Sequence, residues 1–454
     1  MKRWLALFLV LTLCMTFVGC SNGNKGGSNN NDSVSSGPSG STDKSSGTAS
    51  DSKGNSNDSK SVKPIAISFW NGYTGSDGEV LMEYVEKFNK ENPYGITVEM
   101  DINAEFLTKI AAAFAGGKAP DLVLGPSSFK DQYPNYLIDM NEIFTVTSLK
   151  KENWVSSYLD TCSVGDILYV LPMQITGRFM YWNKDLFKAA GLDPEKGPST
   201  YEEWAEWASR ITDKSKNIYG SGVPYDSVFN TCHLLQRMGG LFVDFDENNK
   251  LTPRFKDNEG YAYFLNWYNG MIKSGDNPIE RDTDSMMIAG RIGITVSGAY
   301  LSTGLDSAGI NYGVAQLPNG GAGIQNPNSV GGFSVTTSAS EDAKLAAFKF
   351  LEWWYNGDEN TEVSAILNWS LANGFPSLYI PAINDSRYQS SSKLAAMTGP
   401  QNAVTTYLAP KEFTKTYELL MEVVGPMIEA VVSGNMDAYK ALEEAQKKAE
   451  TLIQ

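Results

Sequence analysis

The sequence predicts an α/β protein made of two lobes, and three observations support that prediction. Apolar stretches of strand length alternate with amphipathic helical stretches between residues 65 and 125. A second apolar run begins near residue 179, after a proline and a short polar bend, where the chain would leave one compact unit and enter another. The length of 454 residues is enough for about two to three domains with large cores.

The first lobe begins with a strand–helix–strand–helix–strand order. We expect strands over residues 65–70, 96–100 and 121–125, a helix that starts at the capping-box sequence 76–79, and a helix over 106–115. This order indicates a largely parallel sheet, because the connections between its strands are helical. Ligands of such sheets bind beyond the carboxyl ends of the strands. The loop after Trp70 and the residues that follow Gly125 leave such ends.

The segment 165–187 connects the two lobes. Residues 167–171 are apolar, and we expect their strand to stop at Pro172, because proline cannot donate a hydrogen bond to a sheet. A polar patch that contains Gln174 and Arg178 follows, and then a second apolar run. Ligand sites favour places where two units meet, so this polar bend is a candidate site.

The amino terminus predicts export and lipidation. A basic pair precedes the apolar run 4–18, which is too short for a comfortable membrane span. The Phe-Val-Gly-Cys sequence at 17–20 resembles a bacterial lipobox, with Phe17 in place of the usual leucine. We therefore expect a signal peptide over residues 1–19 and a lipid on Cys20. An ordinary signal peptide with a chance cysteine is the alternative.

A polar stretch follows the expected lipidation site. Residues 21–61 are rich in Gly, Ser, Asn, Asp and Lys, with no aromatic and almost no aliphatic side chain. They cannot bury enough surface to fold, so 20–61 is a disordered tether, and a coil of about 40 residues spans roughly 35 Å. An anchor with so long a tether is typical of lipoproteins on the extracellular face of a Gram-positive cell membrane.

Composition argues against several function classes. The net charge of −15 argues against nucleic acid, which needs clustered Lys and Arg. His233 is the single histidine, so His-based metal sites and Ser-His catalysis are hard to build. The acidic run 244–249 is expected to be a hairpin turn, since it lacks the Gly and Glu of a calcium loop. No nucleotide or serine-hydrolase motif is present, so we expect no cofactor, no metal and no catalytic residue.

Several motifs occur together in one order. They are Leu-Pro at 171–172 with Tyr-Trp-Asn-Lys-Asp-Leu-Phe-Lys-Ala-Ala-Gly-Leu at 181–192, Ala-Ala-Ala-Phe-Ala-Gly-Gly-Lys-Ala-Pro-Asp-Leu-Val at 111–123, Pro-Ser-Thr-Tyr-Glu-Glu at 198–203, the glycine-rich run 287–300, and the strands 311–318 and 330–333. With this order, the chain resembles the extracellular solute-binding proteins of ABC importers, and among them the group that includes maltose-binding protein. The resemblance covers residues 62–454. Tyr201 stands where the family has tryptophan.

The resemblance implies a periplasmic-binding-protein type II-like fold with two lobes and about three hinge crossings. The lobes would comprise 62–173 with 332–380, and 174–331 with 381–454. Crossings are expected near 172–178, 330–333 and 375–383, and helices after 414 would cap the second lobe. The resemblance also implies a carbohydrate ligand in the cleft, ABC permease subunits as partners, a monomer, and no enzymatic activity.

Aromatic and polar residues at strand ends and crossings are the candidate ligand contacts. A sugar offers an apolar face that packs on a ring and hydroxyls that need hydrogen-bond partners. The predicted ligand-binding residues are Trp70, Asn71, Tyr73, Asp121, Ser127, Gln174, Arg178, Tyr181, Tyr225, Asp226, Asn230, Tyr300, Gly332, Phe333 and Trp369.

Three alternatives stay open at this point. A lipid-anchored carbohydrate-active enzyme would share the anchor, tether and aromatics, because two carboxylates need only spatial proximity. A binding component of a sugar sensor would share the whole fold. Relatives that bind glycerol phosphate esters need cations, and only Arg178 and Arg237 are obvious arginines in the stretches expected to face the cleft. Cys162 and Cys232 are expected to be buried thiols, with a disulfide as the other possibility.

Overall fold

The computed structural model describes residues 64–225, 227–323, 329–357, 363–398, 410, 413 and 415–453. All of them belong to one of the two units of the chain, Lys60–Gln454. The expected signal peptide, Cys20 and tether lie outside the described residues. Within the described residues, no helix is both long and apolar enough to cross a membrane.

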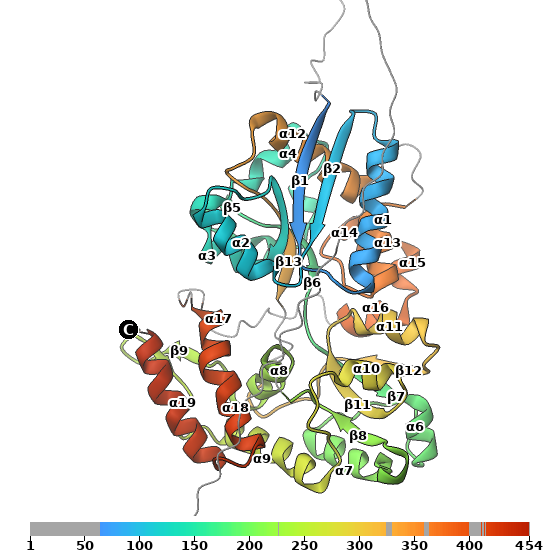
Figure 1. Cartoon of the computed structure of the whole chain (residues 1–454), viewed down its shortest axis with the longest axis vertical. Coiled ribbons are helices and arrows are strands. Elements are labelled where there is room, and N and C mark those ends of the chain that lie inside the picture. Colours follow the sequence, from blue (N-terminus) through green and yellow to red (C-terminus); the bar gives the residue numbers. More distant parts are fainter. Residues whose placement is uncertain are drawn as a thin grey trace, which may run out of the picture. The chain divides into compact units, whose positions relative to one another are not determined.

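The first sheet has the strand order β2-β1-β3-β13-β6 (Figure 1). Its strands are β1 Ile65–Asn71, β2 Ile96–Ile102, β3 Leu122–Pro126, β6 Leu171–Ile175 and β13 Val330–Val335. β1 pairs in parallel with β2 and β3, while β13 runs antiparallel to β3 and β6. The predicted parallel order of the first three strands is therefore confirmed, and the chain returns to this sheet through β13.

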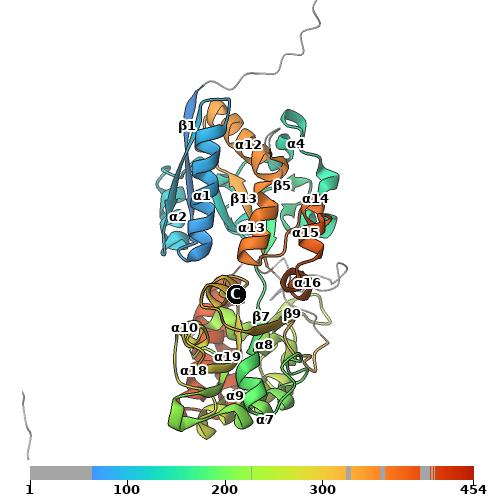
Figure 2. The same cartoon turned by 90° about the vertical axis from the view of Figure 1, so that its right-hand side faces the viewer.

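Helices cover the first sheet. They are α1 Ser76–Glu91, α2 Phe106–Ala115, α12 Glu341–Asn356 and α13 Ala365–Asn373. α12 packs on β1, and α13 lies against both α1 and α12 (Figure 2). Segments more than 200 residues apart thus share one core, because the chain leaves this lobe and comes back to it.

The prediction that a strand ends at Pro172 is wrong, because Pro172 lies inside β6. β6 is at the edge of the sheet, and its register with β13 shifts between Gly331 and Gly332, so that Met173 is the extra residue of a bulge on β6. An edge position with a bulge tolerates a residue that has no backbone N–H to donate. The Pro172 carbonyl still accepts hydrogen bonds, from Trp154 Nε1 at 2.8 Å and from the Tyr355 hydroxyl at 2.9 Å.

The second sheet has the order β12-β7-β11-β8. Its strands are β7 Phe179–Asn183, β8 Tyr219–Gly222, β11 Ile292–Ser297 and β12 Tyr312–Ala315. Side chains alternate along β7, since successive residues of a strand point to opposite faces. Phe179 and Tyr181 join the core of the first sheet, whereas Met180 and Trp182 join a second core. One face of this sheet therefore continues the first core.

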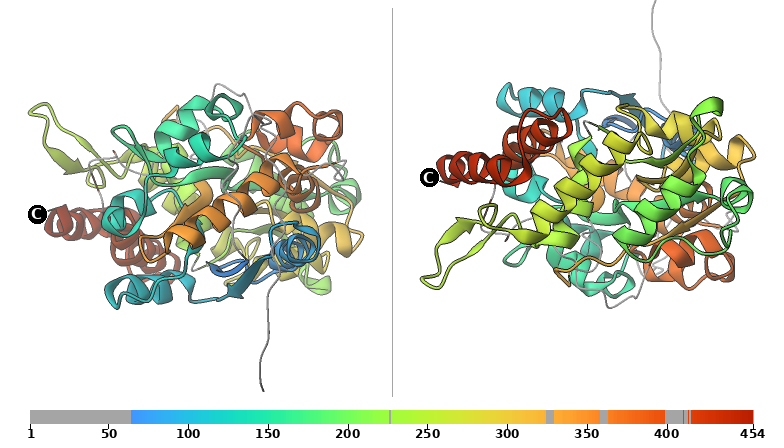
Figure 3. Two further views of the ribbon diagram at one scale, coloured as in Figure 1. Left: turned by 90° about the horizontal axis from the view of Figure 1, so that it is seen from above. Right: turned by 90° about the horizontal axis from the view of Figure 1, so that it is seen from below.

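The second core lies between this sheet and a group of helices. They are α7 Tyr201–Ile211, α8 Val228–Gly239, α9 Glu259–Ser274, α18 Gly425–Val432 and α19 Ala438–Ile453. Thr200 caps α7 as its sequence predicts, with its side chain accepting from the Glu203 amide. α18 and α19 pack on α9, in agreement with the prediction for the chain's end. The run 244–249 forms the expected hairpin, β9 Val243–Phe245 with β10 Leu251–Pro253, beside α19 (Figure 3).

A third group consists of short helices that pack on one another and on strands of the second sheet. They are α10 Thr283–Ile288, α11 Leu301–Ser307, α14 Ile380–Ile383, α15 Ser386–Gln389 and α16 Ser392–Thr398. Leu305 of α11, and Tyr388 and Leu394 near the predicted lobe boundary at 381, are all buried in the first core. The first core thus includes residues from helices that come after strands of both sheets in the chain.

Candidate functional site

The loop after β1 is shaped by Asn71. This residue is fully buried, and its Oδ1 accepts from the Tyr73 amide at 3.0 Å. That contact is a short turn of the kind Asn favours, and it fixes where Tyr73 leaves the strand. The Asn71 Nδ2 group is also buried and has no hydrogen-bond partner among the described residues. A donor is therefore available at the carboxyl end of β1.

Tyr73, Gln174 and Trp369 come together from three distant segments. Trp369 Nε1 donates to Gln174 Oε1, and Gln174 Nε2 donates to the Tyr73 hydroxyl oxygen at 2.9 Å. The Tyr73 ring meets the Trp369 ring edge to face, with 5.8 Å between centroids. Burial raises the pKa of the Tyr73 hydroxyl, so it stays protonated and can donate. With Asn71, these residues form what we call the first-sheet half of the site.

Two glycines of β13 lie close to their neighbours, and Gly331 is the one that borders this half. A Cβ on Gly332 would lie 2.3 Å from the Leu171 carbonyl oxygen, so no other residue fits there without a backbone shift. A Cβ on Gly331 would lie 3.4 Å from the Tyr73 hydroxyl. Phe333, which was predicted to contact ligand, is fully buried in the first core. Gly332 and Phe333 thus serve packing in this structure.

Three further predicted residues of the first lobe lie apart from this cluster. Asp121 accepts two hydrogen bonds from Ser68, each of 2.8 Å, and so ties β3 to β1. The Ser127 amide donates to the Val330 carbonyl at 2.8 Å. Trp70 is half-buried, and the Lys109 ammonium lies 4.5 Å from the centre of its ring. That lysine is itself paired with Asp101, so one face of the Trp70 ring is covered.

Arg178 begins the second-sheet half of the site, which we define as Arg178, Asn230, Asp284 and Tyr300. Arg178 Nε donates to Asn230 Oδ1, and its Nη1 lies 3.4 Å from the carbonyl oxygen of Thr176. Arg178 follows β6 and Asn230 lies in the first turn of α8. The arginine is thereby held at the connection between β6 and β7, close to Gln174.

Asp284 belongs to this half but was not predicted from the sequence. Its Oδ2 accepts from Ser297 Oγ at 2.8 Å, while its Oδ1 is buried and has no hydrogen-bond partner among the described residues. Burial raises the pKa of Asp284 to about 6, against the opposing effects of Ser297 and Arg178. The carboxyl group is thus an acceptor without a full set of donors. No sequence motif marks it, because α10 brings it to β11 only in the folded chain.

The predicted tyrosines of the second lobe have different surroundings. Tyr181 is fully buried and donates to the Gly298 carbonyl at 2.9 Å, so it ties β7 to the segment that precedes Tyr300. Tyr300 is 37% exposed and interacts with Asp284. Tyr225 lies 3.3 Å from Glu429, toward α18. Asp226 lies outside the described residues.

A further pair of aromatic residues was not predicted from the sequence. Phe229 of α8 and Tyr417 of α17 (Thr416–Glu418) have ring centroids 6.2 Å apart at an angle of 32°, and both are exposed. Phe229 directly precedes Asn230 on α8, but neighbouring residues of a helix point in different directions. Each residue alone looks like an ordinary helical aromatic, and only the fold brings them together.

The described residues contain no group of three or more His, Cys, Asp or Glu side chains that could hold a metal ion. His233 is buried, burial lowers its pKa to about 3, and its Nδ1 has no hydrogen-bond partner in the described part of the chain. Cys162 and Cys232 are buried free thiols, as predicted. The site offers rings, amides and hydroxyls, which suit a polyhydroxyl ligand.

Comparison with known proteins identifies a family whose model matches this chain. The model of a family described as bacterial extracellular solute-binding protein matches residues 71–360. The sn-glycerol-3-phosphate-binding periplasmic protein UgpB of Escherichia coli K12 is 24% identical over an alignment of 418 positions, which covers 85% of this chain and 92% of that protein.

Solved structures support the fold. Maltose-bound MalE3 of T. maritima superposes with a TM-score of 0.73 at 18% identity, over 85% of this chain and 99% of that one. UgpB of Mycobacterium tuberculosis, solved in complex with glycerophosphocholine, gives 0.71 at 19% identity, over 86% of this chain and 98% of that one. The predicted type II periplasmic-binding-protein fold is thereby confirmed.

Proposed function

The chain belongs to the bacterial extracellular solute-binding proteins, and from that premise we propose that it is the lipid-anchored receptor of an ABC importer. Its ligand is a sugar or oligosaccharide, held between the two lobes. Ligand that touches both lobes favours a closed form, because its contacts there exceed those in an open form. Permease subunits then recognise the closed form.

The observation that carries this proposal is the convergence of both halves of the site on the connection between β6 and β7. Gln174 is the central member of the hydrogen-bonded chain of the first-sheet half, and Arg178, four residues later, starts the second-sheet half. Ligand contacts come from Trp70, Asn71, Tyr73, Arg178, Asn230, Asp284 and Tyr300. Gln174, Tyr181 and Trp369 hold these groups in place. Ser127 and Tyr225 are contacts at the margins.

Charges near the site favour a neutral sugar over a phosphate ester. The amino terminus of α1 could attract an anion, but the buried Asp77 carboxylate already accepts from the Gly78 amide there, at 2.9 Å. In the second-sheet half, Asp284 offsets the charge of Arg178. Arg237 is buried and donates to the Pro318 carbonyl at 2.7 Å, so it is committed to packing. Phosphate needs donors, whereas a sugar hydroxyl can also donate to the free oxygen of Asp284.

Localisation follows from the amino terminus. Cys20 carries the lipid, the segment 20–61 is the tether, and the monomeric receptor works on the extracellular face of the cell membrane of a Gram-positive bacterium. Its function needs no catalysis. Hydrolysis of a bound glycoside would instead identify a carbohydrate-active enzyme, and the lack of partner permease genes would favour a sensor.

The test is a ligand panel measured on the full chain by calorimetric titration and thermal unfolding. The panel holds maltose, maltotriose, other starch and plant oligosaccharides, and sn-glycerol 3-phosphate. A ligand at 100 times its Kd adds about 2.7 kcal/mol to the free energy of unfolding. The expected result is a rise with one sugar class and none with glycerol phosphate.

Two results would count against the proposal. Consumption of the sugar during the titration, followed by chromatography, would identify an enzyme. Stabilisation by glycerol phosphate and by no sugar would move the chain to the phosphate-binding relatives, and would make Arg178 the central cation.

Substitution of Cys20 by alanine should release the protein from membranes without changing its affinity for the sugar.

A further inference from the structure

Two buried polar atoms in the second lobe lack hydrogen-bond partners among the described residues. They are Asp284 Oδ1 of α10 and His233 Nδ1 of α8. Asp284 is one of the proposed ligand contacts, and His233 is not. A buried polar atom without a partner costs free energy, so natural proteins keep few of them and keep them where they have a use. His233 is also the single histidine of the chain.

His233 lies on the side of α8 that holds Arg178. Residues three apart in a helix are neighbours on its surface, so His233 follows Asn230 by about one turn on the same side. Asn230 Oδ1 accepts from Arg178 Nε, which fixes this side of α8 to the connection between β6 and β7. α8 also contacts β11, the strand to which Asp284 is tied through Ser297. The two unpartnered atoms therefore belong to elements that meet at Arg178 and β11.

The charge of Arg178 reaches both groups. Burial lowers the pKa of His233 to about 3, and the charge of Arg178 lowers it further. Burial raises the pKa of Asp284 to about 6, and Arg178 opposes that shift. His233 is therefore neutral near pH 7, with one ring nitrogen as a donor and the other as an acceptor. It is 8% exposed, so its ring is enclosed by the protein.

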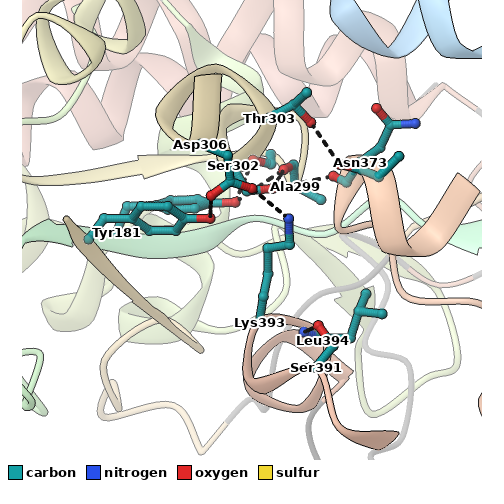
Figure 4. Close-up of polar contacts among 12 residues, drawn as sticks. Tyr181, Ala299, Ser302, Thr303, Asp306, Asn373, Ser391, Lys393 and Leu394 are labelled. Atoms are coloured by element: carbon teal, nitrogen blue, oxygen red, sulfur yellow. Dashed lines mark hydrogen bonds and ion pairs between the residues drawn. The ribbon is translucent and has the colours of Figure 1, made fainter. Parts of the chain in front are cut away.

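The tyrosine nearest in this group already has its partner. Burial raises the pKa of the Tyr181 hydroxyl, and the charge of Arg178 opposes that effect. The hydroxyl lies 2.9 Å from the Gly298 carbonyl oxygen and 3.4 Å from the Ala299 carbonyl oxygen, on the side drawn in Figure 4. Its one proton is committed to the backbone, so Tyr181 is no donor for His233. A ligand beside Arg178 is placed to supply the missing partner.

We propose that His233 is a further ligand-binding residue, whose Nδ1 forms a hydrogen bond with one hydroxyl of the sugar while Asp284 binds another. This proposal rests on the proposed function, because it needs a polyhydroxyl ligand beside Arg178. A hydroxyl can donate or accept, so it satisfies Nδ1 in either tautomer of the ring. A ligand that lacks this hydroxyl leaves Nδ1 buried and unpaired, and the site rejects it for that reason.

The experiment observes His233 directly in the full chain. Because the chain has one histidine, labelling with 15N-histidine and purification without a histidine tag give the ring nitrogen signals of that residue alone. Two-bond 1H–15N correlation spectra are recorded without sugar and with each sugar of the ligand panel. Calorimetric titration of the same samples reports whether that sugar binds.

The expected result has two parts. Without sugar, the ring signals should stay unchanged between pH 5 and 8, because the ring remains neutral. The sugar that binds should move the Nδ1 signal. Monodeoxy analogues of that sugar then locate the hydroxyl. One analogue should bind about five- to ten-fold more weakly and leave the Nδ1 signal at its sugar-free position, since it lacks one hydrogen bond.

Two variants separate direct contact from a structural effect. His233→Phe keeps a planar ring of similar size without nitrogen. It should bind the parent sugar about five- to ten-fold more weakly than wild type, and should bind the parent and the located analogue equally, because neither can form the bond. Cys232→Ala changes the neighbouring buried position of α8 and is the matched control. It should keep the full difference between the two sugars.

A sugar that binds without moving the Nδ1 signal would overturn the proposal and leave the proposed function standing. So would a His233→Phe variant that still distinguishes the parent sugar from the located analogue. Where that variant folds poorly, the wild-type spectra with the deoxy analogues decide. If no sugar of the panel binds, the proposed function fails and the role of His233 fails with it.

Discussion

The two halves of the site differ in the kind of polar group that is left without a partner. In the first-sheet half, Tyr73, Gln174 and Trp369 satisfy one another through hydrogen bonds and an aromatic contact, and the group without a partner among the described residues is the neutral amide Nδ2 of Asn71. In the second-sheet half, the acidic Asp284 keeps a buried oxygen without a partner, and nearby His233 keeps a nitrogen without one, within the described residues. The hydrogen-bonded chain of the first half is built before ligand arrives. The second half has groups whose bonding a ligand could complete.

This contrast distinguishes residues that stabilise the fold around the site from residues that recognise the ligand. A buried polar group without a partner costs free energy, and natural proteins keep such groups where they have a use. The first-sheet half should therefore affect stability strongly when changed. The second-sheet half should affect stability less and ligand affinity more.

The largest expected effect is on Trp369. Trp369→Ala removes a fully buried indole and leaves Gln174 Oε1 without its donor. We expect the free energy of unfolding to fall by about 3–5 kcal/mol, measured by urea unfolding. Trp369→Phe keeps an aromatic ring but has no N–H to donate, and it should lower the free energy of unfolding clearly less. Equal losses for both variants would mean that the hydrogen bond, not the packing, dominates.

Gln174 comes next. Gln174→Leu leaves Trp369 Nε1 and the Tyr73 hydroxyl without their partner and should cost about 1–3 kcal/mol in the same measurement. Gln132→Leu is the matched control, because Gln132 is exposed on α3 (Phe129–Gln132). A loss as small as that of the control would show that the hydrogen-bonded chain contributes little.

Asp284 of the second-sheet half and the neighbouring His233 should be visible in the pH dependence of stability. The pKa of His233 is lowered from 6.5 to about 3, so the unfolded chain takes up a proton first and stability falls as pH drops from about 6.5 to 3. The pKa of Asp284 is raised from 3.8 to about 6, so stability falls as pH rises from about 4 to 6. Each group contributes at most about 1.4 kcal/mol per pH unit.

Two variants separate these opposing slopes. His233→Gln should remove the loss on the acid side, and Asp284→Asn should remove the loss between about pH 4 and 6. Thermal unfolding between pH 3 and 7 measures both. Parallel curves for wild type and both variants would mean that neither group titrates differently in the folded chain.

The smallest expected effect on stability is at Tyr300, which is 37% exposed. Tyr300→Ala should change the free energy of unfolding by about 0.5 kcal/mol or less, as for most surface substitutions. The affinity of the Tyr300→Ala variant for the sugar should nevertheless fall by about ten-fold, since a partly exposed ring beside Asp284 is suited to stack on a sugar face. Tyr219→Ala is a control tyrosine in β8, away from the site.

Much of the fold could be predicted because its signals are local. Alternation along β1 and β2, the Thr200 cap and the hairpin near residue 246 depend on neighbours in sequence. The prediction that a strand ends at Pro172 was wrong because the edge position of β6 is set by tertiary pairing.

The site was harder to predict than the fold. Trp369 looks like a ring near a crossing, yet it is fully buried. Asp284 lies in a run that resembles an ordinary polar loop, and only packing of α10 on β11 brings it to Ser297. The pairing of Phe229 with Tyr417 depends on contacts between α8 and the chain's last helices. Such contacts leave no pattern in a single sequence.

The most direct test is to measure sugar affinity and stability together for Asp284→Asn and Gln174→Leu, with the sugar found in the ligand panel. The central claim is that Asp284 of the second-sheet half recognises ligand directly, whereas Gln174 of the first-sheet half holds other contacts in place. It predicts that Asp284→Asn lowers affinity by about ten-fold or more with little loss of stability, while Gln174→Leu mainly lowers stability. Full affinity in Asp284→Asn, together with a large loss of affinity in a stably folded Gln174→Leu, would contradict it.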